Sequence, residues 1–177
     1  MKKPIFLWQF AGFSLTALLG TLLHFVYDWS GNSIIAAPFS AVNESIFEHM
    51  KLLFFPLLLF AFIESRFLQS TYPQFWCVKL ISITASITFI PMLYYSYTGA
   101  FGVYADWFNI TIFFIADLVA YALAYWLFQN ELSHRCHPHL SLALLLSIGI
   151  VMVLLTFYPP QFPLFRDPLT NTYGYQG

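Results

Sequence analysis

The sequence predicts an all-α integral membrane protein, a bundle of five transmembrane helices. Of the 177 residues, 59% are hydrophobic and only 8% are charged, whereas a soluble domain carries about 25% charged residues. Five apolar runs are each long enough to cross a bilayer core, which takes about 20 residues of helix. Because lipid offers no water to satisfy backbone groups, such runs must form helices. The composition excludes a mainly soluble protein, and we expect the lipid bilayer, not nucleic acid, as its partner.

The first apolar run, residues 5–27, follows Lys2 and Lys3, as the apolar core of a signal peptide does. It is longer than the roughly 7–15 residues of such a core, and no clean cleavage site precedes the polar loop, so we expect a retained span. The other predicted spans are residues 45–63, 75–97, 107–128 and 140–158. The spans form one domain, residues 1–158, and the tail, residues 159–177, is expected to pack over the outer end of the bundle.

Basic residues predict the orientation of the bundle, because cytoplasmic loops carry an excess of Lys and Arg. With the N-terminus inside, the inner side holds Lys2, Lys3, Arg66, Lys79 and Arg135. The outer side holds Arg166, with Lys51 about two turns into the second span. We therefore expect a cytoplasmic N-terminus and an extracytoplasmic C-terminus.

Acidic residues gather at the predicted outer end. Six of the eight acidic residues are expected there, namely Asp28, Glu44, Glu48, Asp106, Asp117 and Asp167. Only Lys51 and Arg166 are placed to neutralise them. A carboxylate-rich pocket in lipid needs a cation, protons or a basic substrate to be stable. This imbalance predicts a ligand site in the outer half of the bilayer.

Helical spacing sorts these residues into shared faces. His24 and Asp28 are four apart at the end of the first span. Glu44 and Glu48 are also four apart, and Lys51 follows three residues later. A capped helix start with a Glu48–Lys51 ion pair would explain this second motif without any function. However, a charge at the centre of a span costs about 2.5–3.5 kcal/mol on insertion scales, so such residues are functional candidates.

The fourth predicted span carries a polar stripe. Its members are Asp106, Asn109, Phe113 and Asp117, at spacings of three, four and four. Asp117 would lie near mid-membrane, where an Asp is protonated, ion-paired or bound to a metal. His24 and Lys51 are its expected partners. We therefore expect His24, Glu48 and Asp117 to converge although they come from three different spans.

One class of function that fits this pattern is a metal-dependent hydrolase acting on a lipid-linked or membrane-proximal substrate. Mixed nitrogen and oxygen ligands suit Zn²⁺ or a similar divalent ion, which makes a nucleophile of its bound water. The predicted metal ligands are His24, Asp28, Glu48, His49 and Asp117. The predicted catalytic residues are Glu44, as general base, with Glu48 and Lys51. The predicted substrate-binding residues are Asp106, Asn109 and Arg166.

Two alternatives remain open. In one, the same carboxylates bind or transport a cation or a basic small molecule, and Asp117 takes part in proton coupling. In the other, the protein is an accessory membrane subunit and its buried charges are interhelical pairs. Transport needs a polar route to the inner side. Below Asp117, spans one, two and four are almost wholly apolar, which favours a one-sided site.

On the predicted inner side, we expect the two cysteines and the Glu64–Arg66 pair to have structural roles only. Cys77 and Cys136 lack a CxxC spacing and are expected in a reducing compartment, so we predict inert thiols and no disulfide. Glu64 and Arg66 are predicted to form a pair at the membrane interface, with their stems along apolar surface.

Two stretches of the chain carry a recognisable pattern. The first is His24-Phe25-Val26-Tyr27-Asp28-Trp29-Ser30-Gly31, followed by Asn43-Glu44-Ser45 and Glu48-His49-x-Lys51. The second runs from Pro160 through Phe165, Asp167 and Thr170 to Tyr173-Gly174. Together they resemble a family of small bacterial multi-span proteins of unknown function, which implies a bacterial cytoplasmic-membrane protein. A fainter similarity, to seven-span metal-dependent lipid amidases, rests on His and carboxylates within a helical bundle. This chain has fewer spans and lacks their paired His motif near the C-terminus.

Overall fold

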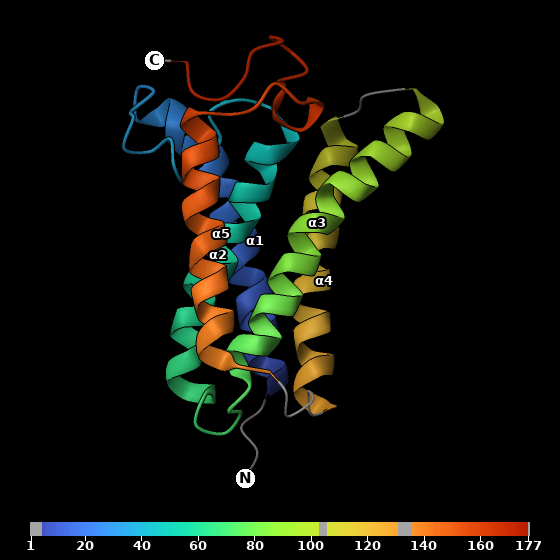
Figure 1. The fold of residues 1–177 in the computed structure, drawn as a ribbon. Coiled ribbons are helices and arrows are strands. Elements are labelled where there is room, and N and C mark those ends of the chain that lie inside the picture. Colours follow the sequence, from blue (N-terminus) through green and yellow to red (C-terminus); the bar gives the residue numbers. More distant parts are fainter. Residues whose placement is uncertain (1–4, 103–105, 131–135, 177) are drawn as a thin grey trace.

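The computed structural model describes residues 5–102, 106–130 and 136–176, which form an all-helical bundle. The helices are α1 (Ile5–Trp29), α2 (Ile46–Leu68), α3 (Phe75–Phe101), α4 (Asp106–Gln129), α5 (Pro138–Phe157) and the 3₁₀ turn η1 (Pro163–Phe165). Five α-helices of the described part are long and apolar enough to cross a membrane, which confirms the predicted fold class. The start of α1 and the C-terminal tail lie at opposite ends of the bundle (Figure 1). Lys2, Lys3 and Arg135 lie outside the described residues, so the orientation in the membrane stays a prediction.

Two glycines bring α1 close to α4. A Cβ atom on Gly12 would overlap the ring of Tyr121, and one on Gly20 would overlap the ring of Phe113. Small residues allow transmembrane helices this close approach. Between the glycines, the hydroxyl groups of Thr16 and Tyr121 are hydrogen-bonded at 2.7 Å. From Gly20 towards the start of α1, the two helices are therefore tightly packed.

Prolines interrupt two of the spans. Pro56 lies inside α2 and Pro91 inside α3. Neither has an N–H group to donate to the carbonyl four residues earlier. The C-terminal part of α3 leans away from the rest of the bundle (Figure 1), and a proline is an ordinary cause of such a bend.

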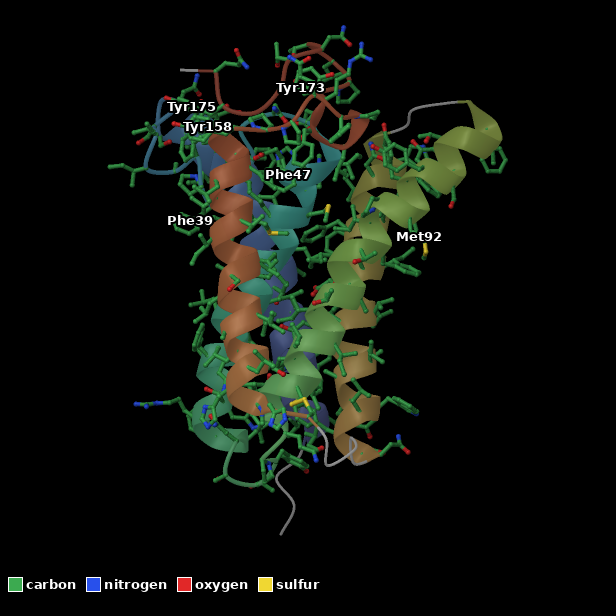
Figure 2. The ribbon with its side chains drawn as sticks, in the orientation of Figure 1. Phe39, Phe47, Met92, Tyr158, Tyr173 and Tyr175 are labelled. Atoms are coloured by element: carbon green, nitrogen blue, oxygen red, sulfur yellow. A yellow bond between two sulfur atoms is a disulfide. The ribbon has the colours of Figure 1, made fainter. Side chains whose placement is uncertain are left out.

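Residues 159–176 form a tail across the end of the bundle where α1 ends and α2 begins, and we call this end the tail end (Figures 1 and 2). Phe165 is buried with its ring centroid 4.7 Å from that of Phe47. Tyr175 packs its ring on Tyr27 and Phe157. Burial of this apolar surface stabilises the arrangement at about 25 cal/mol per Å². The tail thus covers the tail end of the bundle.

The two cysteines form a disulfide, so the prediction of inert thiols was wrong. Cys77 lies at the start of α3 and Cys136 just before α5, and their Cα atoms are 6.3 Å apart. The bond lies at the end of the bundle away from the tail (Figure 2). The prediction rested on a reducing compartment at this end of the bundle, and a disulfide there argues against that placement. The separation of 59 residues also hides the pairing in the sequence, because only the fold brings the first turns of α3 and α5 together.

The predicted interface pair of Glu64 with Arg66 was also wrong. Glu64 is fully buried and forms an ion pair with Lys79 of α3. Its other oxygen accepts a hydrogen bond from Gln9 of α1 at 2.6 Å. This buried network joins three helices. Because Lys79 is buried and paired, it is not one of the loop charges that indicate the orientation in the membrane.

Candidate functional site

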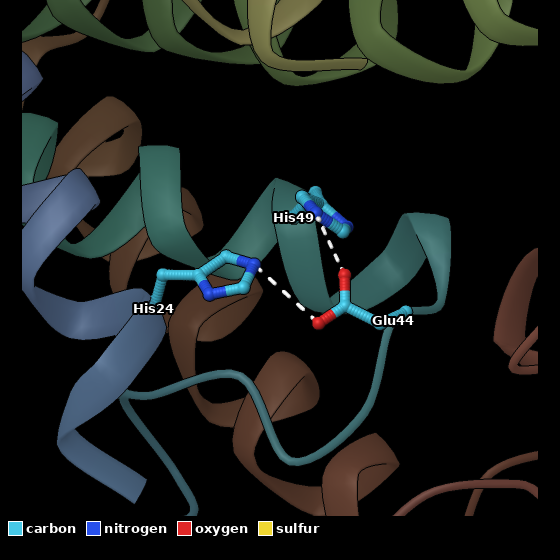
Figure 3. A group of neighbouring side chains, drawn as sticks. All are labelled: His24, Glu44 and His49. Carbon is cyan, nitrogen blue, oxygen red and sulfur yellow. Dashed lines mark ion pairs between the residues drawn. The ribbon is translucent and has the colours of Figure 1, made fainter. Parts of the chain in front are cut away.

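Three side chains that could hold a metal ion meet at the tail end of the bundle, and we call them the ligating group. His24 comes from α1, Glu44 from the loop before α2 and His49 from the first turns of α2 (Figure 3). His24 Nε2 lies 3.5 Å from Glu44 Oε1, and His49 Nε2 lies 3.6 Å from Glu44 Oε2. One nitrogen or oxygen from each residue lies within 4.8 Å of the other two. The carboxylate therefore stands between the two imidazoles.

The start of α2 fixes the ring of His49. Ser45 is the N-cap, and its side-chain oxygen accepts a hydrogen bond from the Glu48 N–H. The Ser45 carbonyl lies 2.9 Å from His49 Nδ1. A carbonyl only accepts hydrogen bonds, so Nδ1 must carry the proton. In the neutral ring, Nε2 then presents a lone pair towards the Glu44 carboxylate, so that a proton or a metal cation between the two atoms would make the contact favourable.

The surroundings of Glu44 favour its ionised form. The hydrogen bond with His24 lowers the pKa of Glu44 below its ordinary value of 4.5, and the charges of His49 and His24 act in the same direction. Partial burial opposes this shift. The side chain is 34% exposed, so a carboxylate that keeps its charge remains accessible at the tail end.

A cavity of about 450 Å³ lies beside these three residues. Gly20 and Leu52 are buried and line its inner part. Its other walls include Phe25, Asn109, Ile110, Phe113 and Phe114. The cavity is thus mostly apolar, with the polar His–Glu–His group on one side and the Asn109 amide on another, as expected of a small-molecule site. Asn109, predicted to bind substrate, lies where it can do so.

Glu48 and Lys51 form a separate, fully buried ion pair. Lys51 Nζ lies 2.7 Å from Glu48 Oε2, and both side chains are at most 1% exposed. Nζ also donates to the Ala37 carbonyl at 2.8 Å and to Thr156 Oγ1 at 2.9 Å. These three bonds use every donor of the ammonium group. The Glu48–Lys51 ion pair predicted as the non-functional explanation of the motif is confirmed, and it ties α2 to the preceding loop and to α5.

Asp117 lies deep in the bundle, away from the ligating group. It is 0% exposed, and neither carboxylate oxygen has a hydrogen-bond partner among the described residues. Its expected partners are engaged elsewhere, since Lys51 pairs with Glu48 and His24 pairs with Glu44. The ligating atoms that come together belong to His24, Glu44 and His49, and not to His24, Glu48 and Asp117 as predicted.

Three other predicted residues have different positions. Asp28 is exposed at the end of α1 and is not part of the ligating group. Asp106 begins α4, but its side chain lies outside the described part of the structure. Arg166, expected near Asp28, Glu44 or Asp106, instead donates a hydrogen bond to Asn171 within the tail.

The position of Glu44 explains why its contacts with His24 and His49 were not predicted. Helical spacing placed Glu44 on the face of Glu48, but α2 begins only at Ile46. A residue before the N-cap does not follow the 100° per residue of the helix. Its side chain therefore turns back towards His24 and His49. The Asn43-Glu44-Ser45 sequence held the signal that the helix begins after Glu44. Ser45 is a favoured N-cap residue, and in the structure Asn43 Oδ1 accepts a hydrogen bond from the Ser45 N–H.

Comparison with known proteins places the chain in a family without assigning an activity. The chain belongs to the family described as "Family of unknown function (DUF6512)", which matches residues 2–175. This confirms the resemblance to a family of unknown function. Neither the curated proteins nor the solved structures contain a match to this chain.

Proposed function

We propose that this member of an uncharacterised family is a metal-dependent membrane hydrolase acting on a lipid-linked or membrane-proximal substrate. His24, Glu44 and His49 would hold one divalent ion. The observation that supports the proposal is their convergence within 4.8 Å beside an apolar cavity. Two histidines and one carboxylate are a ligand set of catalytic zinc sites, which leave a fourth position for water.

The residues present fit such an ion. Both imidazoles direct Nε2 at the carboxylate, and the Ser45 carbonyl holds His49 in the tautomer that a metal requires. Ionised Glu44 supplies one negative charge. When bound, the ion would lower the pKa of a water molecule and so supply a nucleophile near neutral pH. Glu44, predicted as the general base, thus becomes a proposed ligand, while Glu48 and Lys51 keep a structural role.

The spans and the charges support a cellular location. The described helices indicate a multi-pass membrane protein. The bacterial cytoplasmic membrane, with the tail end on the extracytoplasmic side, is part of this proposal and is supported by the excess of Lys and Arg expected at the other end. The Cys77–Cys136 disulfide at that other end opposes this orientation, because disulfides are typical of an oxidising compartment.

A transport protein is the second candidate, and two observations favour it. Asp117 is a fully buried carboxylate without a partner among the described residues. Polar groups continue beyond it, at the Thr16–Tyr121 hydrogen bond and at the Glu64–Lys79 pair, where the sequence predicted almost wholly apolar spans. Such intramembrane polar groups are typical of ion or proton pathways.

Metal analysis of the purified protein tests the proposal. After loading with zinc and desalting, we expect about one zinc per chain, held by the three side chains. The variants His24→Ala and His49→Ala should retain much less. Matched controls are Asp28→Asn, an exposed carboxylate at the same end, and His139→Ala, an exposed histidine at the other end. Equal zinc content in all four variants and the wild type, or none in the wild type, would refute the site.

A further inference from the structure

One loop of the tail contributes a side chain to the cavity beside the ligating group. This side chain is Leu169, which lines the cavity and is 67% exposed. The other lining residues belong to α1, α2, α4 and the loop before α2. Because the surface of Leu169 is accessible, a molecule that occupies the cavity can touch it directly.

The sequence Asp167-Pro168-Leu169-Thr170-Asn171 builds the loop that carries this side chain. Asp167 is buried, and its Oδ1 accepts the Leu169 N–H at 2.8 Å while its Oδ2 accepts the Thr170 hydroxyl at 2.6 Å. The Asp167 carbonyl accepts the Asn171 N–H at 3.0 Å, and Asn171 has a φ of 59°, a conformation that Asn tolerates. Pro168 restricts the backbone at the start of the turn. Leu169 is thus held in a closed turn.

The chain on both sides of this turn is attached to the bundle. Before it, the buried ring of Phe165 packs on Phe47 with their centroids 4.7 Å apart. After it, the Gly174 carbonyl accepts a hydrogen bond from Asn43 Nδ2 at 3.3 Å. Asn43 directly precedes Glu44 in the sequence. The tail is therefore tied to the same segment that supplies the carboxylate of the ligating group.

The rest of the cavity offers few polar contacts to a ligand. None of the described residues that line it is Lys or Arg. The Thr21 hydroxyl is donated to the Ala17 carbonyl at 2.8 Å, and Asn109 offers at most its amide N–H group, since its Oδ1 is buried. The exposed apolar residues of the lining are Phe25, Ile110, Phe114 and Leu169. The part of a ligand that extends away from the ligating group is thus expected to be uncharged and apolar.

We propose that Leu169 is a specificity-determining residue, which packs against an apolar group that the ligand carries next to its metal-binding atoms. This inference rests on the proposed metal site and adds a class of substrate to it, namely molecules with an alkyl or aromatic group beside the metal-bound oxygen. Each methylene group that binding removes from water strengthens it about fourfold. A small polar ligand gains nothing from Leu169, because it occupies only the space at the ligating group.

Two hydroxamic acids separate these cases, because they bind zinc through the same atoms and differ in the attached group. Benzohydroxamic acid carries a phenyl ring, and acetohydroxamic acid carries a methyl group. Binding is measured by calorimetry with zinc-loaded protein in nanodiscs, and empty nanodiscs give the partition background. Leu169→Ala should weaken benzohydroxamic acid about fivefold and acetohydroxamic acid less than twofold.

Phe162→Ala is the matched control, since Phe162 is an exposed apolar residue of the same tail and does not line the cavity. It should leave the affinity of both probes unchanged. Leu169 is itself exposed, so its substitution should not disturb folding. A Leu169→Ala protein that binds both probes as the wild type does, or that loses both equally, overturns the role of Leu169.

Asp167 is expected to act as a positioning residue for Leu169. Asp167→Ala removes both acceptors of the turn and should weaken benzohydroxamic acid as Leu169→Ala does, with acetohydroxamic acid little changed. Asp167→Asn keeps an oxygen for the Leu169 N–H and should recover much of the affinity. Equal loss of both probes in Asp167→Ala, or no recovery in Asp167→Asn, contradicts this positioning role.

Zinc content, measured on the same samples, distinguishes two failures. A wild-type protein that binds no zinc refutes the proposed function and this inference with it. A wild-type protein that binds zinc, but whose Leu169→Ala variant treats the two probes alike, refutes the contact with Leu169 and leaves the metal site standing.

Discussion

Replacing Lys51 by methionine should destabilise the protein strongly. The ammonium group makes three short bonds, to Glu48 Oε2, the Ala37 carbonyl and Thr156 Oγ1, in a fully buried position. Lys51→Met fills similar space but leaves the Glu48 carboxylate without its counter-ion. Breaking a buried pair in this way costs about 3–5 kcal/mol. For a protein of this size, about 4 kcal/mol lowers the melting temperature by roughly 8–16 °C.

Thermal unfolding in detergent, followed by tryptophan fluorescence, measures this effect. Arg66→Met is the matched control, because Arg66 is exposed and its removal should change the melting temperature little. The double variant Glu48→Gln/Lys51→Met removes both charges and should recover much of the loss, since no bare carboxylate remains. The reasoning fails if Lys51→Met has the same melting temperature as Arg66→Met. It also fails if the double variant is no more stable than Lys51→Met.

Three further predictions follow from the described contacts. Because the pKa of Glu44 is lowered from 4.5, its ionised form stabilises the metal-free protein above about pH 4.5, and this contribution is lost as the pH falls through the lowered value. Glu44→Gln should therefore have a lower melting temperature than the wild type at pH 6, and this difference should vanish at acidic pH. A difference that stays constant from pH 6 into acid contradicts the pairing of Glu44 with the two histidines. Asp117→Asn should be as stable as the wild type or more stable, because an amide cannot carry a charge into the apolar interior, and a large fall in melting temperature would show that the carboxylate has a charged partner. Truncation after Tyr158 removes the buried Phe165 ring and should cost at least about 3 kcal/mol, the effect of losing one core Phe, whereas unchanged unfolding would show that the tail does not stabilise the bundle.

The fold was predictable from the length of its apolar runs. Lipid enforces helices of about 20 residues, and the observed spans follow the predicted ones closely. The largest error at a helix end is at α2, which continues to Leu68 and not to residue 63. The charge of Glu64 indicated a helix end there, but Lys79 neutralises this carboxylate inside the bundle. A local charge pattern could not reveal a partner on another helix.

The candidate site was predictable only in part. His24 and His49 were predicted as metal ligands, and the structure brings them together with Glu44. Spacing along one helix tells which residues share a face, but it does not tell which faces meet. The register between α1, α2 and α4 decides that Glu44 meets the two histidines and that Asp117 does not. The pairing of Cys77 with Cys136 depends on the same kind of long-range register.

X-ray absorption at the zinc edge tests the central claim most directly, namely that His24, Glu44 and His49 hold one divalent ion. In the zinc-loaded wild type we predict two imidazole ligands, with Zn–N distances of about 2.0–2.1 Å. The remaining first-shell ligands should be oxygen. In His49→Ala, one imidazole should disappear from the spectrum. A zinc ion without imidazole ligands in the wild type, or the same two imidazoles in His49→Ala, would contradict the proposed site.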